Sequence, residues 1–520
     1  MLVVLMSLSL SLSEASEGGA EEGKTCISER RRSPGRVRRE SIGPRREGRS
    51  LPSWKPRHPP RWPKNQSTRP PTEKPSTTEE DSEEQNVNAK EITYPEGGFA
   101  AWSVAFGSWC AMTCGMGLVN SVGMFQALVA TSVLPTYSNQ AIGWIFGIFV
   151  FVSYFCGVQI GPVFDRHGPQ GLMALGTVCL LVGIFTTAQC TEYYQFILAF
   201  SILTGAGCSL LFTPAIGAIS HWFNKRRGTA SGFAFVGSAL GGVMWPLMMQ
   251  SLVPKVGWAW AMRTVGFVLL VLCVASVLLC RSRLEIRQAK ASSTWRDMLP
   301  DPRMFVDGTG AMAFTTAGVF FIEWAYFVPV SYIPSYYLAR QGLAEDSDAG
   351  GDAAFAYQLL AIINGASCIG RYMPGYIADK VGRYNTMVVS IAICLVSVAC
   401  FWLPDALGQD GGGGAGLITG FAILFGLVSG SNITLVPICL GQLCETHDYG
   451  RYYATSYTVA SLACLTGIPI AGGLVDMEGA NDRRAYWRPL VFAIASYVGA
   501  FACFFWVRVR VKGWDWRVKW

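Results

Sequence analysis

Gly161-Pro-Val-Phe-Asp165-Arg166-His-Gly168 is followed later in the chain by a second string of the same form, Gly375-Tyr-Ile-Ala-Asp379-Lys380-Val-Gly382-Arg383. Each string comes at the end of a long apolar segment and has the pattern G-x-x-x-D-[RK]-x-G. Glycine lets helices approach closely and permits a tight turn, and the carboxylate can pair with a nearby Arg or Lys at a membrane surface. Two such strings at equivalent places predict a chain built from two equivalent halves. We interpret their residues as structural gates that touch no substrate.

The composition indicates a membrane protein with a charged tail. Of the 520 residues, 51% are hydrophobic and only 15% are charged, whereas a soluble chain of this size carries about 25% charged residues. The first 90 residues hold 30 of the 77 charged residues, and the remaining 430 residues hold 47. This distribution excludes a soluble globular enzyme. It predicts a disordered tail at 1–92, attached to a body that crosses a membrane many times.

Apolar segments of about 20 residues alternate with short polar loops from Phe99 onward. Each is long enough to cross about 30 Å of hydrocarbon as a helix. The sequence therefore predicts an all-α membrane protein with twelve transmembrane helices in two six-helix halves, 93–281 and 308–510. A linker at 282–307 joins the halves, and a tail follows at 511–520. The expected spans are 100–126, 141–163, 170–189, 195–219, 229–252, 258–280, 308–332, 354–377, 385–404, 416–439, 453–475 and 488–507.

Lys and Arg are unevenly divided between the two sets of connections. The connections on the tail's side, with the C-terminus, carry 18 of them, and the opposite connections carry six. Positive residues collect on the cytoplasmic side of membrane proteins. We therefore expect both termini and the linker in the cytoplasm, with the chain in the plasma membrane or, alternatively, the vacuolar membrane. The basic tail then lies beside anionic lipid, and no nucleic-acid partner is expected.

Sequence patterns typical of enzymes and metal sites are not found. No nucleophile elbow and no His/Cys/Asp cluster occurs. Most of the 16 cysteines lie inside apolar segments without the spacing of metal ligands or disulfides. We therefore expect no enzymatic activity, no metal and no cofactor.

Three further strings narrow the interpretation. They are Pro95-Glu96-Gly97-Gly98-Phe99-Ala-Ala-Trp102, His221-Trp222-Phe223-Asn224-Lys225-Arg226-Arg227-Gly228-Thr-Ala-Ser-Gly232 and Gly370-Arg371-Tyr-Met-Pro374-Gly375. With the repeated loops, they resemble the major facilitator superfamily, and within it the monocarboxylate-porter family, particularly its fungal branch. The resemblance covers about residues 92–510. It implies two halves that rock around a midplane site, and a proton-linked secondary active transporter of a small organic anion such as a monocarboxylate.

Arg371 is the most informative residue of the expected eighth span. A charged side chain inside a membrane helix costs several kcal/mol unless it faces water or a partner, so it marks a candidate functional site. Arg371 lies eight residues before Asp379, about 12 Å from the cytoplasmic end at ~1.5 Å per residue. The matching arginine of monocarboxylate porters binds the substrate anion, so the resemblance implies this role for Arg371. The alternative is a structural ion pair with another helix.

Three polar residues join Arg371 in the candidate substrate site: Asn120, Asn364 and Ser367. Proton-coupled animal porters carry an aspartate at the position of Ser367 and a lysine at that of Asn120. Because both charges are missing here, their proton mechanism cannot be transferred intact. These side chains can hydrogen-bond a polar substrate, and the alternative is that they fill helix interfaces.

Glu323 is the candidate proton-coupling residue. It lies about 15 residues into the expected seventh span, roughly 22 Å from the cytoplasmic side and about 10 Å above Arg371. A direct ion pair between the two is therefore not expected. The alternatives for Glu323 are a protonated, hydrogen-bonded structural carboxyl or an interface residue that reaches outside water.

The expected partners are a small-molecule substrate, protons and the lipid bilayer, and protein partners are left open. Two other functions compete with anion transport. One is a non-transporting nutrient receptor that signals through its basic, Ser/Thr-rich N-terminal tail. The other is a passive facilitator or an exporter of another small metabolite.

Overall fold

The computed structural model describes residues 95–223, 226–282, 302–306, 308–342, 351–408, 415–444, 449–477 and 483–515. Within these residues every regular element is helical. The predicted N-terminal tail, most of the predicted linker and the end of the predicted C-terminal tail lie outside the described residues.

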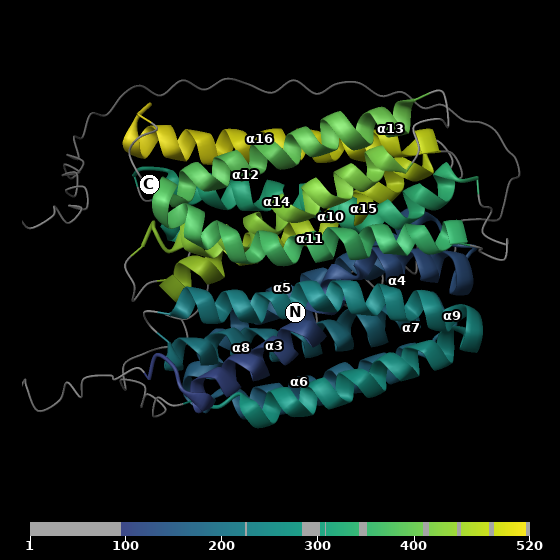
Figure 1. Cartoon of the computed structure of the whole chain (residues 1–520), viewed down its shortest axis with the longest axis horizontal. Coiled ribbons are helices and arrows are strands. Elements are labelled where there is room, and N and C mark those ends of the chain that lie inside the picture. Colours follow the sequence, from purple (N-terminus) through teal and green to yellow (C-terminus); the bar gives the residue numbers. More distant parts are fainter. Residues whose placement is uncertain are drawn as a thin grey trace, which may run out of the picture. The chain divides into compact units, whose positions relative to one another are not determined.

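The helices of the first group follow the expected apolar segments (Figure 1). Short π-helical turns, η1 (Val129–Val133) and η2 (Ile197–Thr204), continue α4 and join α7 to α8. The α-helices are α3 (Phe99–Asn120), α4 (Val122–Leu128), α5 (Asn139–His167), α6 (Pro169–Thr187), α7 (Tyr193–Phe196), α8 (Gly205–Trp222) and α9 (Arg227–Leu279).

Helix α9 supplies two membrane passes. Its 53 residues would extend about 80 Å at ~1.5 Å per residue, far more than the ~30 Å of a bilayer core. At Gly257 the backbone leaves the helical region, with φ 74° and ψ 169°. Glycine reaches positive φ without the steric cost of a Cβ atom. The chain folds back there (Figure 1), so α9 contains the expected fifth and sixth spans.

The second group contains the remaining helices. Two 3-10 turns, η4 (Pro302–Phe305) and η6 (Arg483–Tyr486), precede α10 and α16, and the π-helix η5 (Val398–Trp402) joins α12 to α13. The α-helices are α10 (Ala311–Arg340), α11 (Gly351–Val381), α12 (Arg383–Ser397), α13 (Leu403–Leu407), α14 (Gly416–Leu440), α15 (Tyr449–Asp476) and α16 (Trp487–Lys512).

The number of passes agrees with the prediction. Ten helical stretches in the described residues are long and apolar enough to cross a membrane. This count takes α9 once and omits α11, which carries the buried polar residues Asn364, Ser367 and Arg371. Counting α9 twice and adding α11 gives the twelve predicted passes.

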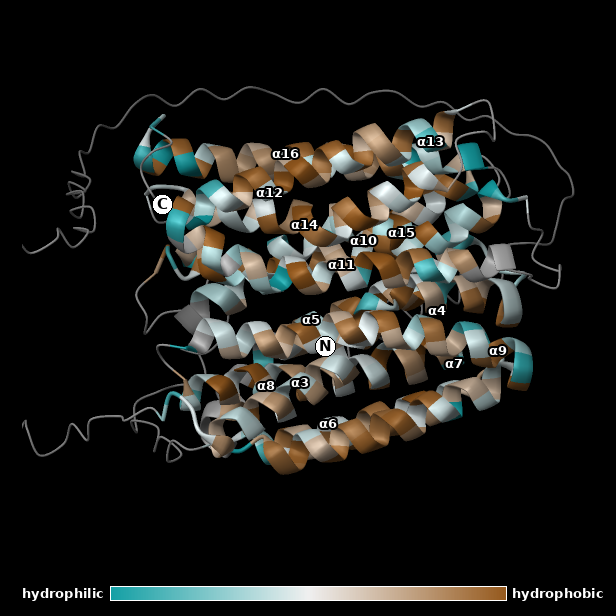
Figure 2. Ribbon diagram, viewed as in Figure 1, coloured by the Kyte–Doolittle hydropathy of each residue, from teal (hydrophilic) through white to brown (hydrophobic). Residues whose placement is uncertain are grey.

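Apolar side chains cover the outer surface of the helix bundle. On α6, for example, Leu175, Val178 and Val182 are about half exposed and share one helix face. Hydrophobic residues run along α6 and α16, and hydrophilic residues gather at helix ends (Figure 2). Such a surface is unfavourable in water and suits contact with lipid chains.

The two groups meet along a few helices. Helices α3–α9 pack mainly on one another, and so do α10–α16. Between the groups, α5 packs against α15, the first part of α9 packs against α11, and α4 meets α10. Helix α3 begins and α16 ends at one end of the bundle (Figure 1), which we call the terminal side. The opposite end, where η1 ends and α5 begins, is the distal side.

Candidate functional site

A break in the first span shapes the centre of the molecule. Ser121 separates α3 from α4, with φ −100° and ψ 7°. The Met124 N–H donates to the carbonyl of Ser121 and not to that of Asn120. The Asn120 carbonyl instead accepts a hydrogen bond from Asn364 Nδ2 at 3.4 Å. The break thus leaves a backbone acceptor in the interior, which a side chain of the second group uses.

Helix α11 presents one polar face to this break. Asn364, Ser367 and Arg371 are spaced by three and four residues, so they share a helix face. All three are buried, and Arg371 is only 3% exposed. Asn364 Nδ2 also donates to the Gly242 carbonyl of α9 at 3.2 Å. Within the first group, Asn120 Nδ2 donates to the Ser238 carbonyl at 3.0 Å, which joins the end of α3 to α9.

The Arg371 guanidinium is held by neutral groups alone. Its Nε donates to Ser367 Oγ at 2.9 Å, and its Nη1 donates to the Phe235 carbonyl at 3.3 Å and to Ser238 Oγ. Its Nη2 is buried and has no hydrogen-bond partner. No carboxylate of the described residues lies within ion-pair distance of Arg371. The positive charge is therefore fixed in position and not balanced by any described acidic group.

The four predicted substrate residues thus lie together. Asn120, Asn364, Ser367 and Arg371 belong to one buried polar cluster between α3, α9 and α11. Sequence reasoning missed Ser238, one of several serines in α9, which carries no signal of its own. Its role depends on how α9 docks against α11.

Tyr326 of α10 connects this cluster to a cavity. Its hydroxyl donates to Asn120 Oδ1 at 3.4 Å. Its ring forms part of the wall of a small cavity between α10 and α14, with room for about one water molecule. The cavity is lined by Ile322, Glu323, Tyr326, Ser429, Asn432, Ile433 and Val436.

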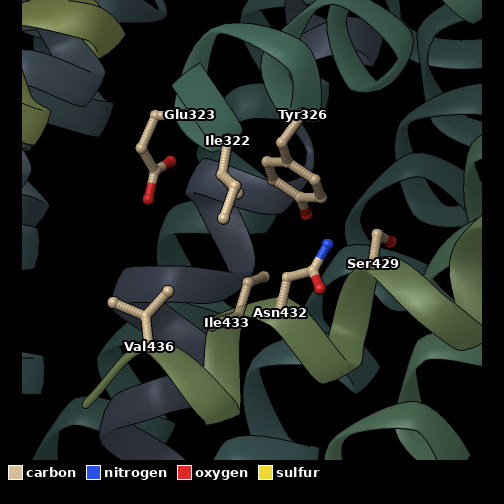
Figure 3. A pocket seen from close by; sticks show the side chains of 7 residues that line it. All are labelled: Ile322, Glu323, Tyr326, Ser429, Asn432, Ile433 and Val436. Carbon is tan, nitrogen blue, oxygen red and sulfur yellow. The ribbon is translucent and has the colours of Figure 1, made fainter. Parts of the chain in front are cut away.

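The polar side chains of the cavity come from both of its helices. In Figure 3, the Glu323 carboxyl and the Tyr326 hydroxyl point from α10 toward α14, and the Asn432 amide points back toward Tyr326. Ser390 Oγ donates to Asn432 Oδ1 at 2.6 Å, which orients the amide. Sequence reasoning missed Asn432 and Ser429, although an asparagine inside the apolar α14 was a usable signal.

Glu323 has no cationic partner among the described residues. It is 8% exposed, and its Oε2 accepts a weak hydrogen bond from Cys464 Sγ of α15 at 3.8 Å. No ion pair joins it to Arg371 in the described part of the chain. The hydroxyls of Tyr154, Tyr326 and Tyr457 lie within electrostatic range of the carboxyl.

The repeated loops have matching backbone geometry. Gly168 follows α5 with φ 73°, and Gly382 follows α11 with φ 110°. Each amide donates to the carbonyl four residues earlier, at 2.8 Å in both loops. Only glycine adopts such angles readily, which explains its place in both strings.

The other predicted gate residues lie on the terminal side, away from the polar cluster. Gly161 lies in α5 and Gly375 in α11. Lys380 stacks its ammonium on the Tyr376 ring at 4.2 Å from the centroid, and Arg383 begins α12. The side chains of Asp165, Arg166 and Asp379 lie outside the described part of the structure, so their expected pairing stays a prediction.

The distal side is closed by contacts between the groups. Asp476, the last residue of α15, accepts from the Asn139 amide at 3.2 Å, from Asn139 Nδ2 at 2.8 Å and from the Gln140 amide at 2.9 Å. The carboxylate thus caps the N-terminus of α5, where helix amides lack partners and the helix dipole is positive.

Replacing Asp476 by alanine should favour opening of the distal side. Hydrogen bonds to charged groups are worth about 1.5–3 kcal/mol, so the equilibrium should shift roughly 30-fold toward the open form. Hydrogen exchange of the first amides of α5 should accelerate accordingly. Asp476→Asn keeps one acceptor oxygen but no charge, so its exchange rate should fall between those of the wild type and Asp476→Ala. Unchanged exchange in both variants would refute the cap.

Comparisons with known proteins identify relatives over most of the chain. The Major Facilitator Superfamily model matches residues 98–468. The riboflavin transporter MCH5 of Saccharomyces cerevisiae is 33% identical over 461 residues, which cover 85% of this chain and 84% of that protein. The fujikurins efflux protein of Gibberella fujikuroi is 33% identical over 383 residues, 74% of this chain and 77% of that protein.

A fungal transporter and a solved structure extend the comparison. The MFS-type transporter opdF of Penicillium oxalicum is 33% identical over 432 residues, which cover 82% of this chain and 94% of that protein. The crystal structure of the nucleoside transporter NupG matches with a TM-score of 0.60 and 12% identity, over 79% of this chain and all of that chain. At that identity the match concerns the fold alone.

Proposed function

Because this chain belongs to the Major Facilitator Superfamily of membrane transporters, we propose that it carries a small organic anion, such as a monocarboxylate, by secondary active transport. The observation that carries this proposal is the uncompensated guanidinium of Arg371. A buried charge is costly when nothing neutralises it, and an anionic substrate supplies the missing charge. A guanidinium also binds carboxylates with two parallel hydrogen bonds, and the free Nη2 is available for one of them.

The contacts between the two helix groups fit a mechanism of alternating access, in which the site opens to one side of the membrane at a time. In the conformation described here, contacts between α4 and α10 and the Asp476 cap close the distal side. The cavity reaches Val436, about one turn from the terminal end of α14. The Lys and Arg bias supports placing the terminal side, and both termini, in the cytoplasm. The described conformation is then closed on its outer side, and we place the protein in the plasma membrane or the vacuolar membrane.

Glu323 is proposed to couple transport to protons. A carboxyl group inside a membrane body, without a cation beside it, is a favourable place for a proton to bind and leave. The neighbouring Cys464, Tyr154, Tyr326 and Tyr457 add no charge at neutral pH. A proton that binds Glu323 from one side and leaves to the other would link the substrate's movement to the proton gradient.

Glu323→Gln should abolish acid stimulation of uptake and leave a pH-independent basal rate, because glutamine keeps the shape but cannot titrate. The measurement is initial uptake at pH 5 and pH 7 in vesicles of fixed membrane potential. Cys464→Ala is the matched control, because it removes the thiol donor and keeps the carboxyl. Acid stimulation that persists in Glu323→Gln would exclude this residue as the coupling site.

Transport of a labelled panel in vesicles tests the proposed function itself. The panel contains monocarboxylates and their neutral amides. We expect saturable uptake of acids, competition by unlabelled acids and no competition by amides. Equal transport of acids and amides by a correctly inserted protein would overturn the proposal.

A neutral polar metabolite is the second candidate substrate class. Asn120 and Ser367 stand where charged residues occur in the animal porters, so the site is richer in hydrogen-bonding groups than in charge. The similarity to a riboflavin transporter supports a neutral heterocycle, and the similarity to an efflux protein supports export. Including riboflavin in the panel tests the neutral substrate. Measuring efflux of labelled compounds from preloaded vesicles tests export.

A further inference from the structure

The contact between α5 and α15 changes character along its length. Near the distal side it depends on glycine: a Cβ on Gly147 would lie 2.7 Å from the Leu465 carbonyl oxygen. Nearer the terminal side, two aromatic rings meet instead. Tyr154 and Tyr457 lie nearly parallel, with an interplanar angle of 11° and ring centroids 6.0 Å apart. The two groups therefore meet through backbone at one end and through ring faces at the other.

A third tyrosine extends this contact toward the terminal side. Tyr453 lies one turn before Tyr457 on α15 and stacks on it, with centroids 4.3 Å apart and an angle of 28°. Tyr457 is buried, whereas Tyr154 and Tyr453 are half-buried. We call these three residues the tyrosine row. Because its outer members remain partly accessible, the row presents aromatic surface that another ring can contact.

The tyrosine row ends close to the charged groups of the candidate site. Tyr154 lies within electrostatic range of Arg371, and also of Glu323 and Tyr326. Tyr154 is the sixteenth residue of α5, about 22 Å from the helix start at ~1.5 Å per residue. This depth is far from the distal end, and a belt of interfacial tyrosines does not explain a ring at the level of Arg371.

We propose that the tyrosine row binds the planar ring of an aromatic carboxylate whose carboxyl group is held by Arg371. This inference rests on the proposed function, since it names the substrate class of the same site. Aromatic faces bind flat rings by offset stacking, and the preference over a saturated ring exceeds simple burial of area. The row combines rings from both helix groups, and its partly accessible members are Tyr154 and Tyr453.

Two acids that differ only in the ring provide the test: benzoate and cyclohexanecarboxylate. Calorimetric titration of the purified full chain should give benzoate an affinity about five times higher. Burial of apolar surface alone would favour the saturated ring, because it has more apolar hydrogen atoms. Tyr457→Leu should remove the preference by weakening benzoate binding alone, and Tyr457→Phe should keep it.

The possible outcomes separate the two proposals. Equal affinities in the wild type, or a preference that survives Tyr457→Leu, would overturn the aromatic site and leave anion binding intact. If neither acid binds, both proposals are overturned. Arg371→Gln should weaken the binding of both acids alike, whereas Tyr457→Leu should weaken the binding of benzoate alone. Should Tyr457→Leu fail to fold, Tyr453→Leu at the more exposed end of the row provides the same comparison.

Discussion

Replacing Arg371 by glutamine should lower carboxylate transport at least 100-fold while the protein stays folded. A carboxylate on the unpartnered Nη2, with a second hydrogen bond taken over from the neutral partners of Nε or Nη1, gains two charge-assisted hydrogen bonds of about 1.5–3 kcal/mol each, and ~1.4 kcal/mol corresponds to a factor of ten. Folding should not suffer, because the guanidinium has only neutral partners and glutamine removes a buried charge. The measurements are vesicle uptake and the thermal unfolding midpoint. Arg371→Lys keeps the charge but loses the planar guanidinium, so its uptake should fall between that of the wild type and that of Arg371→Gln.

Arg340 offers a matched control. It is the last residue of α10, its side chain is 8% exposed, and its Nε lies 3.1 Å from Asp405 Oδ2, with Tyr336 donating to the same oxygen. Removing one partner of a buried ion pair costs about 3–5 kcal/mol. Arg340→Gln should therefore destabilise the protein and leave the choice of substrate unchanged. If both glutamine variants lost stability alike and Arg371→Gln kept its uptake, the charge of Arg371 would be structural.

Gly123→Ala should strongly impair transport by preventing closure of the distal side. A Cβ at this position would lie 2.1 Å from the Val330 carbonyl oxygen and 3.0 Å from that of Ser331. These are backbone atoms of α10 in the other helix group, so no side-chain rotation relieves the clash. Separation of the groups does relieve it, and the open form should therefore dominate. We expect at least a tenfold loss of uptake, with faster hydrogen exchange in α4 and the distal end of α10.

Gly370→Ala is the informative comparison. Its Cβ would lie 1.9 Å from the Leu427 carbonyl oxygen, but α11 and α14 belong to the same group. Rocking of the groups cannot relieve this clash, so we expect loss of folded protein. Normal uptake in Gly123→Ala, or a folding failure like that of Gly370→Ala, would contradict a moving contact between α4 and α10.

Much of the fold could be predicted because its signals are local. Apolar segments determine where helices cross the membrane, and the Lys and Arg bias suggests which loops share a side. The repeated loops indicated the two halves, and Gly168 and Gly382 later proved to have matching geometry. Asn364, Ser367 and Arg371 could be grouped because helical spacing puts them on one face.

Other features depend on how distant segments dock, so single stretches of sequence carry no signal for them. No proline marks the break at Ser121. The contact between Arg371 and Ser238 requires the relative placement of α11 and α9. The stack of Tyr154 on Tyr457 likewise joins residues some 300 positions apart, and the cavity between α10 and α14 needs both helices in place.

The most direct test of the central claim compares an acid with its amide. Benzoate and benzamide share ring and shape, but only benzoate carries a negative charge that can neutralise Arg371. Titration of the purified full chain should show benzoate binding at least 100-fold more tightly, with the difference lost in Arg371→Gln. Equal affinities for the two compounds, or a difference that persists in Arg371→Gln, would contradict an anion site at Arg371.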